Sequence, residues 1–283
     1  MSILIGLTGW GDHPALYNHQ AEKVDKLYTY SSHFPVVEVD TSFYAIPSPL
    51  QFDKWINKTP NDFSFVIKAY QGITGHDRKT YTNAEMKEMI QQLLEAIQPV
   101  KSAGKLNCLL FQFPPWFKPN RENIDKLKKI KRWVGNVPTA IEFRNRRWYE
   151  PYEKETLSFL ETEGWIHVIC DEPQAGEGSV PTVICSTTDH AVIRFHGRNV
   201  YGWNNNGQEN WRKVRFLYRY NEEELEEWKN RILELQKRVK TITILFNNNS
   251  GGDAHDNAKQ LMNMLDIQYD NLNPKQMDLF DLF

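Results

Sequence analysis

The sequence has few cysteines, no long apolar run and no surplus of charge of one sign. Its 283 residues include only three cysteines, Cys108, Cys170 and Cys185. Three cysteines cannot form a complete disulfide framework, so reduced thiols in a cytoplasmic protein are the simpler interpretation. No stretch approaches the roughly 20 apolar residues of a membrane-spanning helix, and the first residues lack the pattern of a secretory signal. We therefore expect a soluble, cytoplasmic protein with no membrane partner.

The charge balance restricts how this protein can bind an anion. With 36 acidic and 34 basic residues, the formal net charge is −2, which excludes a broadly basic surface of the kind that coats nucleic acid non-specifically. The glycines in residues 6–11 (GLTGWG) do not follow the GxGxxG spacing of a dinucleotide-binding turn. Any anion site must therefore be local.

What the sequence does have is eight short apolar runs, each ending in or followed by a polar or charged residue. The runs are residues 3–7, 36–40, 63–68, 106–112, 139–144, 166–171, 191–196 and 241–247. Parallel strands that are buried on both faces have this near-continuous apolar composition. We expect an α/β fold, a parallel eight-stranded TIM (β/α)8 barrel over residues 1–272, followed by a short extended C-terminal tail over residues 273–283.

The segments between the runs carry helix signals. Apolar residues at helical spacing predict a helix over residues 83–97, and Asn120, Asn221 and Asp253 each stand where a further helix begins. Pro151 and Gly164 bracket another helix. Residues 20–31 and 49–58 supply the helices that follow the first two strands.

Ordered segments along nearly the whole chain resemble the YecE-like family, a family of uncharacterised TIM-barrel proteins with a domain of unknown function. The segments are GLTGW (residues 6–10), VEVDTSFYAIP (37–47), FSFVIKAYQGITGH (63–76), LLFQFPPWF (109–117), AIEFRNRRW (140–148), IRFHGRN (193–199) and NNNSGGDAHDNA (247–258). The resemblance implies a TIM barrel. It implies no reaction, so function has to be argued from the site.

Alternate residues of a strand share one face, which gives a list of polar side chains expected inside the barrel mouth, at the carboxyl ends of the strands. In chain order they are Glu38, Asp40, Lys68, Gln112, Glu142, Arg144, Asp171, Arg194, His196, Arg198, Asn247 and Asn248. Active sites of this fold lie at that end. The alternative is a buried ion-pair network that only holds the barrel together, but such networks are poor stabilisers, so we favour a functional site.

The residue types suggest roles within that site. The expected catalytic residues are Glu142 or Asp171 as general base, His196 as acid or orienting donor, and Lys68. Lys68, Arg194 and Arg198 would hold an anionic group.

The loops around the mouth add aromatic and glycine residues. Trp10 follows the first strand, and Tyr201 and Trp203 follow the seventh close to Arg198, a combination that stacks bases or sugars or else forms a lid. Gly251 and Gly252 before a helix start would suit a phosphate or simply a tight turn, and Asp253 at that start disfavours an anion.

The strand ends offer few metal ligands. One Mg²⁺ or Mn²⁺ would suit a set drawn from Glu38, Asp40, Glu142, Asp171 and His196. A cluster of zinc ions would need more strand-end histidines than His196 alone. His13 and His76 lie on loops, where solvated histidines are the simpler interpretation.

The C-terminal tail contains a motif for a protein partner. Residues 276–280, QMDLF, resemble the pentapeptide with which bacterial repair and replication proteins dock on the DNA sliding clamp. Gln276 and Met277 would precede the apolar anchors Leu279 and Phe280, presented from an exposed terminus. The alternative is that the apolar side chains of the tail pack on the barrel or on a second copy.

Three classes of function remain. The favoured class is an enzyme acting on a phosphate-containing substrate, with nucleic acid as the preferred substrate and phosphodiester hydrolysis or DNA repair as the reaction. The second is an isomerase, lyase or hydrolase of a small sugar phosphate. The third is a non-catalytic adaptor that associates with the sliding clamp.

Overall fold

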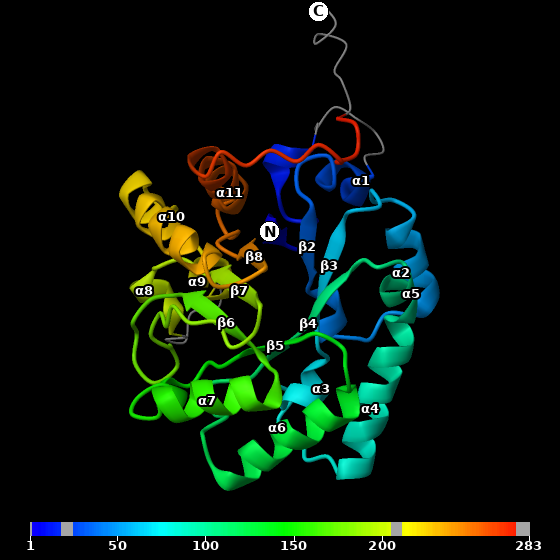
Figure 1. Cartoon of the computed structure of the whole chain (residues 1–283), viewed down its shortest axis with the longest axis vertical. Coiled ribbons are helices and arrows are strands. Elements are labelled where there is room, and N and C mark those ends of the chain that lie inside the picture. Colours follow the sequence, from blue (N-terminus) through cyan, green and yellow to red (C-terminus); the bar gives the residue numbers. More distant parts are fainter. Residues whose placement is uncertain (1, 18–24, 205–210, 276–283) are drawn as a thin grey trace, which may run out of the picture.

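A computed structural model of the chain describes residues 2–17, 25–204 and 211–275. Eight parallel strands close into a barrel in sequence order, with helices around it, which confirms the TIM barrel (Figure 1). The strands are β1 (Ser2–Thr8), β2 (Val36–Val39), β3 (Ser64–Lys68), β4 (Leu106–Gln112), β5 (Thr139–Glu142), β6 (Ile166–Asp171), β7 (His190–Phe195) and β8 (Thr241–Phe246). Each expected run matches one strand to within two residues at either end.

The described helices lie between successive strands in the chain, except α11, which follows β8. They are α1 (Lys26–Tyr30), α2 (Pro49–Ile56), α3 (Gln71–Thr74), α4 (Asn83–Ala96), α5 (Gln98–Ser102), α6 (Arg121–Val134), α7 (Glu153–Glu163), α8 (Val200–Trp203), α9 (Trp211–Arg215), α10 (Glu222–Gln236) and α11 (Asp253–Met264), with 3-10 turns at Pro14–Leu16, Thr41–Phe43 and Arg146–Trp148. The side chains of Asn120 and Asn221 cap α6 and α10 as predicted. Gly164 ends α7 in a left-handed conformation. Residues 20–24 of the expected first helix lie outside the described residues.

Strand residues that point away from the barrel axis form the layer between sheet and helices. Phe195 of β7 stacks on Phe246 of β8 with ring centroids 4.4 Å apart and meets Trp228 of α10. Phe143, just after β5, stacks on Trp148 at 4.0 Å. Burial of each such ring contributes about 2–3 kcal/mol to the free energy of unfolding. This packing leaves the other alternate set, which includes Glu142 and Arg194, inside the barrel.

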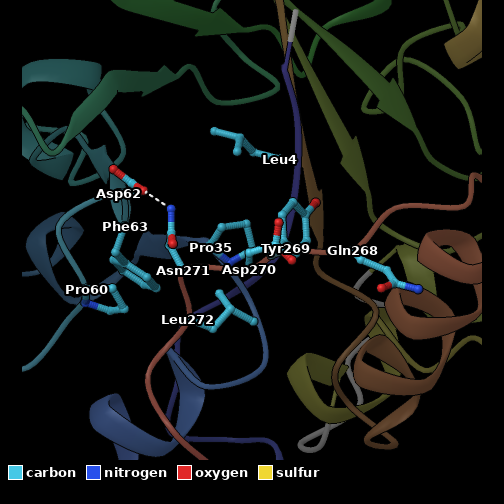
Figure 2. A pocket seen from close by; sticks show the side chains of 10 residues that line it. All are labelled: Leu4, Pro35, Pro60, Asp62, Phe63, Gln268, Tyr269, Asp270, Asn271 and Leu272. Carbon is cyan, nitrogen blue, oxygen red and sulfur yellow. Dashed lines mark hydrogen bonds between the residues drawn. The ribbon is translucent and has the colours of Figure 1, made fainter.

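The segment after α11 crosses the amino-terminal ends of the strands. The Tyr269 hydroxyl accepts a hydrogen bond from Ile5 N at 2.9 Å, and Asn273 is bonded to Ser31 and Lys58. A cavity of about 210 Å³ lies beneath this segment, where Asn271 donates to Asp62 at 2.6 Å (Figure 2). The chain is therefore anchored as far as Asn273 on the face opposite the mouth. The tail residues 276–283 lie outside the described residues.

No helix among the described residues is both long and apolar enough to cross a membrane.

Candidate functional site

The polar side chains inside the mouth form a buried cluster with Arg194 at its centre. We define the mouth cluster as Glu38, Asp40, Lys68, Gln112, Glu142, Arg144, Arg194, His196 and Asn247. Arg194 of β7 donates to both carboxylate oxygens of Glu38 on β2, from Nε at 2.9 Å and from Nη2 at 2.7 Å. Its Nη1 donates to Glu142 on β5. Arg194 is 1% exposed and both carboxylates are fully buried, so these bonds cross the interior of the barrel.

Glu142 is the acceptor that the other members share. Gln112 donates to it at 2.7 Å, and the Arg144 guanidinium forms a second ion pair with it. Burial opposes ionisation of Glu142, but Arg144 and Arg194 outweigh burial and hold the pKa of this carboxyl well below its usual range. Glu142 is therefore a carboxylate near neutral pH. It is also a weak base.

His196 is neutral in this environment. Burial and the nearby Arg144 guanidinium lower its pKa well below the usual value. Arg144 Nη2 lies 2.8 Å from His196 Nε2, and the Asn247 amide lies 3.0 Å from Nδ1. A guanidinium can only donate, so Nε2 accepts, and we assign the ring proton to Nδ1, which requires Asn247 to present its amide oxygen. His196 thus contacts Arg144 as an acceptor through Nε2, whereas the sequence suggested an acid or an orienting donor.

Glu172 and Arg215 are members of the site that sequence reasoning missed. Glu172 directly follows β6 and accepts hydrogen bonds from Arg144 and, at 2.6 Å, from the Val180 amide. Burial raises the pKa of Glu172 to about 7, against the opposing effect of Arg144. Arg215 of α9 stacks 4.2 Å from the Trp203 ring centroid, and its Nε has no hydrogen-bond partner among the described residues.

Lys68 and Asp40 form the outer edge of the cluster, and His76 lies beside them. Lys68 Nζ pairs with Asp40 at 2.8 Å and lies 4.5 Å from the Phe43 ring centroid. His76 packs edge-on against Phe43, with centroids 4.9 Å apart. Burial, followed by the charges of Lys68 and Arg144, lowers the pKa of His76 to about 4. His76 is therefore a half-buried neutral residue of the mouth and not the solvated loop histidine that was expected.

The expected orientation of Asp171 is wrong. Asp171 points away from the barrel interior, where it accepts from Trp228 Nε1 at 2.6 Å, from the Tyr220 hydroxyl at 2.8 Å and from Arg198. Its neighbours in the chain face inward instead: Glu172 meets Arg144, and Cys170 Sγ lies within 4.8 Å of Glu142 and His196 ligand atoms. Every residue of β6 is buried, so this strand has no polar and apolar alternation from which its inner face could be read.

Arg198 and Asn248 are also placed outside the cluster. Arg198 pairs with Asp171 at 2.6 Å and with Glu224 of α10 at 3.2 Å. Asn248 is fully buried and donates to the Tyr218 carbonyl and to Asn257 of α11, each at 2.9 Å. Both residues link the loops after β7 and β8 to the outer helices.

The aromatic residues of the loops differ in their positions. Trp203 is 2% exposed and covers the cluster, with Arg144 5.3 Å from its ring centroid. Tyr201 is 95% exposed. Trp10 packs edge-on against Trp55 of α2 at 5.1 Å. Of the three, Trp203 is the one that the structure brings to the cluster.

The donor set does not fit the Mg²⁺ or Mn²⁺ ion that the sequence suggested. Glu38, Asp40 and Glu142 already accept from arginine or lysine, and Asp171 faces outward. Within the described residues, Glu142, Cys170 and His196 bring potential ligand atoms together, but two guanidinium groups contact Glu142 and burial raises the pKa of Cys170 well above its usual value. A protonated thiol and a carboxylate neutralised by two cations are poor ligands for a hard dication.

Comparison with known proteins places this barrel among relatives without an assigned reaction. The profile of a family described as "Protein of unknown function DUF72" matches residues 4–279. UPF0759 protein YunF of Bacillus subtilis is 51% identical over 281 residues, which cover 98% of this chain and 100% of that protein. UPF0759 protein YecE of Escherichia coli K12 is 24% identical over 216 residues, which cover 69% and 74% of the two chains.

Solved structures of the same kind superimpose on nearly the whole barrel. A DUF72 family protein of Enterococcus faecalis V583 has a TM-score of 0.89 and 40% identity, and covers 98% of this chain and 100% of its own. A DUF72 family protein of Thermotoga maritima has a TM-score of 0.80 and 31% identity, with coverage of 94% and 100%. None of these descriptions names a substrate.

Proposed function

The chain belongs to the DUF72 family of proteins of unknown function, and from that premise we propose that it is an enzyme acting on a phosphate-containing substrate at the barrel mouth. One observation carries the proposal: two arginines, Arg144 and Arg194, are buried together with three glutamates at the end of the fold where active sites lie. The glutamates are Glu38, Glu142 and Glu172, and Arg194 joins Glu38 to Glu142. Burying such ions costs more free energy than packing apolar residues of the same volume. A barrel needs no charge there for its stability, so their position supports a role in chemistry.

The anion would be bound by cationic side chains whose N–H donors are not all used in hydrogen bonds to carboxylates. Arg194, predicted for this role, directs its donors at Glu38 and Glu142 and instead fixes the positions of those carboxylates. An ammonium group has three donors, and among the described residues Asp40 is the acceptor bonded to Lys68. Arg215 has an unpartnered Nε. We assign phosphate binding to Lys68 and Arg215, while Arg144 is paired with Glu142 and Glu172.

We assign proton transfer to Glu172. A general acid or base works best when its pKa is close to the working pH, and burial raises that of Glu172 to about 7. Glu142, predicted as a base, is held ionised by two guanidinium groups and orients Arg144 and Arg194. His196 accepts from Arg144 and shares this orienting role.

Turnover of simple phosphate esters tests the proposal. We expect the full chain to hydrolyse p-nitrophenyl phosphate, its bis-ester or a short oligonucleotide, and Glu172→Gln to lower kcat about a hundredfold or more. Glu234→Gln, at an exposed carboxylate of α10, is the matched control and should leave the rate unchanged. A chain that hydrolyses none of these phosphate compounds would overturn the proposal, whether or not it binds them.

The depth of the cluster favours a second candidate, a small sugar-phosphate isomerase, lyase or hydrolase. His196 and Glu142 are fully buried beneath Trp203, where a small molecule fits more readily than a polymer. Turnover of free sugar phosphates with no oligonucleotide binding would select this candidate.

We also propose that the tail docks on a bacterial sliding clamp and that the protein is cytoplasmic. The sequence QMDLF supports docking, although Gln276, Met277, Leu279 and Phe280 lie outside the described residues. Asn273 is anchored on the face opposite the mouth, so a docked tail would leave the mouth accessible. Three free cysteines suit a reducing compartment.

A further inference from the structure

The loops after β2, β3 and β4 carry a group of aromatic side chains outside the mouth cluster. We call Phe43, Tyr44, His76 and Trp116 the aromatic rim. Tyr44 is 60% exposed and Trp116 is 46% exposed. Single exposed rings are common, but these two belong to one contiguous group of aromatic side chains, and contiguous exposed apolar patches mark sites of interaction. None of the rim residues was singled out in the sequence as a stacking residue.

The rim is continuous with the mouth cluster. Lys68 lies over the Phe43 ring, and Phe43 is in edge contact with Tyr44 at 5.2 Å and with His76 at 4.9 Å. His76 then meets Trp116, with centroids 6.1 Å apart. A ligand bound across the rim would therefore reach Lys68, which the proposed function makes an anion-binding group.

The outer end of the rim is held in place by specific contacts. Trp116 Nε1 donates to the Gly75 carbonyl at 3.3 Å, and Arg78 lies over the Trp116 ring at 4.6 Å. Arg78 adopts φ +58°, a left-handed conformation that costs free energy for any residue with a Cβ. Gly75, Arg78, Lys79 and Trp116 line an open cavity of about 500 Å³.

The charges around this cavity are mainly positive. Arg78 and Lys79 are exposed, and Lys126 lies beside Gly75. Two acids are nearby: Asp77 accepts from the Tyr81 hydroxyl and the Lys79 amide, and Glu122 lies close to Lys126. Exposed rings flanked by cations fit a chain of bases joined by phosphates, because each base has a face to stack and each linkage carries a negative charge. A neutral sugar carries no negative charge with which Arg78 and Lys79 could pair.

We propose that the aromatic rim, with Arg78 and Lys79, is a stacking subsite for single-stranded nucleic acid, which lies across Trp116 and Phe43 and delivers one phosphate to Lys68. This inference rests on the proposed function of the mouth cluster and names its substrate class. It assigns base stacking to Trp116 and backbone contact to the two cations.

Fluorescence anisotropy with labelled ten-nucleotide strands of deoxythymidine and of uridine tests the subsite on the full chain. We expect saturable binding to one or both strands, about tenfold weaker in Trp116→Ala and largely restored in Trp116→Phe. Arg78→Ala should weaken binding and flatten its salt dependence, whereas Arg78→Lys should retain much of both. Tyr28→Ala and Lys240→Ala are matched controls, since both residues are exposed and far from the rim, and they should bind like the parent chain.

The outcomes separate the subsite from the proposed function. Binding weakened by Lys68→Met but unchanged in Trp116→Ala would overturn the subsite and leave the proposed function standing. Binding weakened by Trp116→Ala, in a chain that hydrolyses no phosphate ester, would support the subsite and overturn the enzymatic proposal. Absence of oligonucleotide binding, or equal binding of a neutral oligosaccharide, would overturn the subsite.

Discussion

Among the carboxyl groups of the site, Glu172 is the one whose ionisation we expect to change the free energy of unfolding most clearly near neutral pH. Its pKa is raised from 4.5 to about 7 in the folded chain, mainly by burial. The folded state therefore binds more protons than the unfolded state between these values, and the stabilisation present at low pH is lost as the pH rises through about 7. A shift of this size corresponds to at most about 3 kcal/mol.

We expect the free energy of unfolding of the parent chain, minus that of Glu172→Gln, to fall between about pH 5 and pH 8. Urea denaturation of both chains across this range measures it. Histidines such as His76 and His167, whose pKa values are lowered to about 4, give the opposite slope in both chains and cancel in the difference. A difference that does not change with pH would contradict the raised pKa.

Arg194 is the residue whose loss should cost the cluster most. Among the described residues, Arg194→Met leaves Glu38 with one weak hydrogen-bond partner, the Thr8 hydroxyl at 3.4 Å. The change should lower the free energy of unfolding by about 3–5 kcal/mol. Adding Glu38→Gln removes the stranded charge and should recover part of that loss. Urea denaturation of the two single variants and the double variant gives the coupling energy, and a coupling near zero would mean that the two groups do not interact as described.

At the scale of elements, Asp171 joins β6 to α10. Its carboxylate accepts hydrogen bonds from Trp228 Nε1, the Tyr220 hydroxyl and Arg198 on the outer side of the barrel. We expect Asp171→Asn to lower the free energy of unfolding by about 2–4 kcal/mol, because a neutral amide is a weaker acceptor for three donors. Thermal and urea unfolding measure this effect.

The same variant separates a structural from a catalytic role. Asp171→Asn should leave oligonucleotide affinity and any phosphate-ester turnover unchanged at a temperature where it is folded, unlike Glu172→Gln. A hundredfold loss of turnover in the folded Asp171→Asn chain would restore Asp171 as a catalytic candidate.

These two neighbours also show how far the sequence allowed prediction. The eight strands could be located because each is a short apolar run between helix signals, and the face shared by Glu142 with Arg144, or Arg194 with His196, followed from alternation. Asp171 was misplaced because β6 is buried on both faces. Glu172 was missed because the inward alternation continues one residue past the strand, and Arg215 because only folding brings α9 to the mouth.

At the scale of the whole molecule, the cluster is balanced by its own cations, so its integrity should not depend on a metal ion. Among the described residues, the cluster carboxylates Glu38, Glu142 and Asp40 are paired with Arg194, Arg144 and Lys68 respectively. These pairs leave no excess negative charge that a metal ion would have to neutralise. We expect dialysis against EDTA to leave the thermal midpoint of unfolding unchanged, as measured by circular dichroism. A fall of several degrees that Mg²⁺, Mn²⁺ or Zn²⁺ reverses would show a stabilising metal site.

The two faces of the barrel are expected to act independently. Asn273 fixes the start of the tail on the face opposite the mouth, so contacts made by the tail should not alter ligand binding at the cluster. We expect the full chain to bind the cognate sliding clamp saturably in a calorimetric titration. Changing Leu279 and Phe280 to alanine should weaken that binding at least tenfold, because buried apolar anchors supply most of the affinity of such short motifs.

The control for this prediction is oligonucleotide affinity, which should be the same in the tail variant and the parent chain. Glu172→Gln should show the reverse behaviour, with clamp affinity retained and turnover lost. If the tail variant instead loses thermal stability and neither chain binds the clamp, Leu279 and Phe280 pack on the barrel or on a second copy. The small-molecule candidate would then gain weight, because the link between this barrel and DNA would rest on the aromatic rim alone.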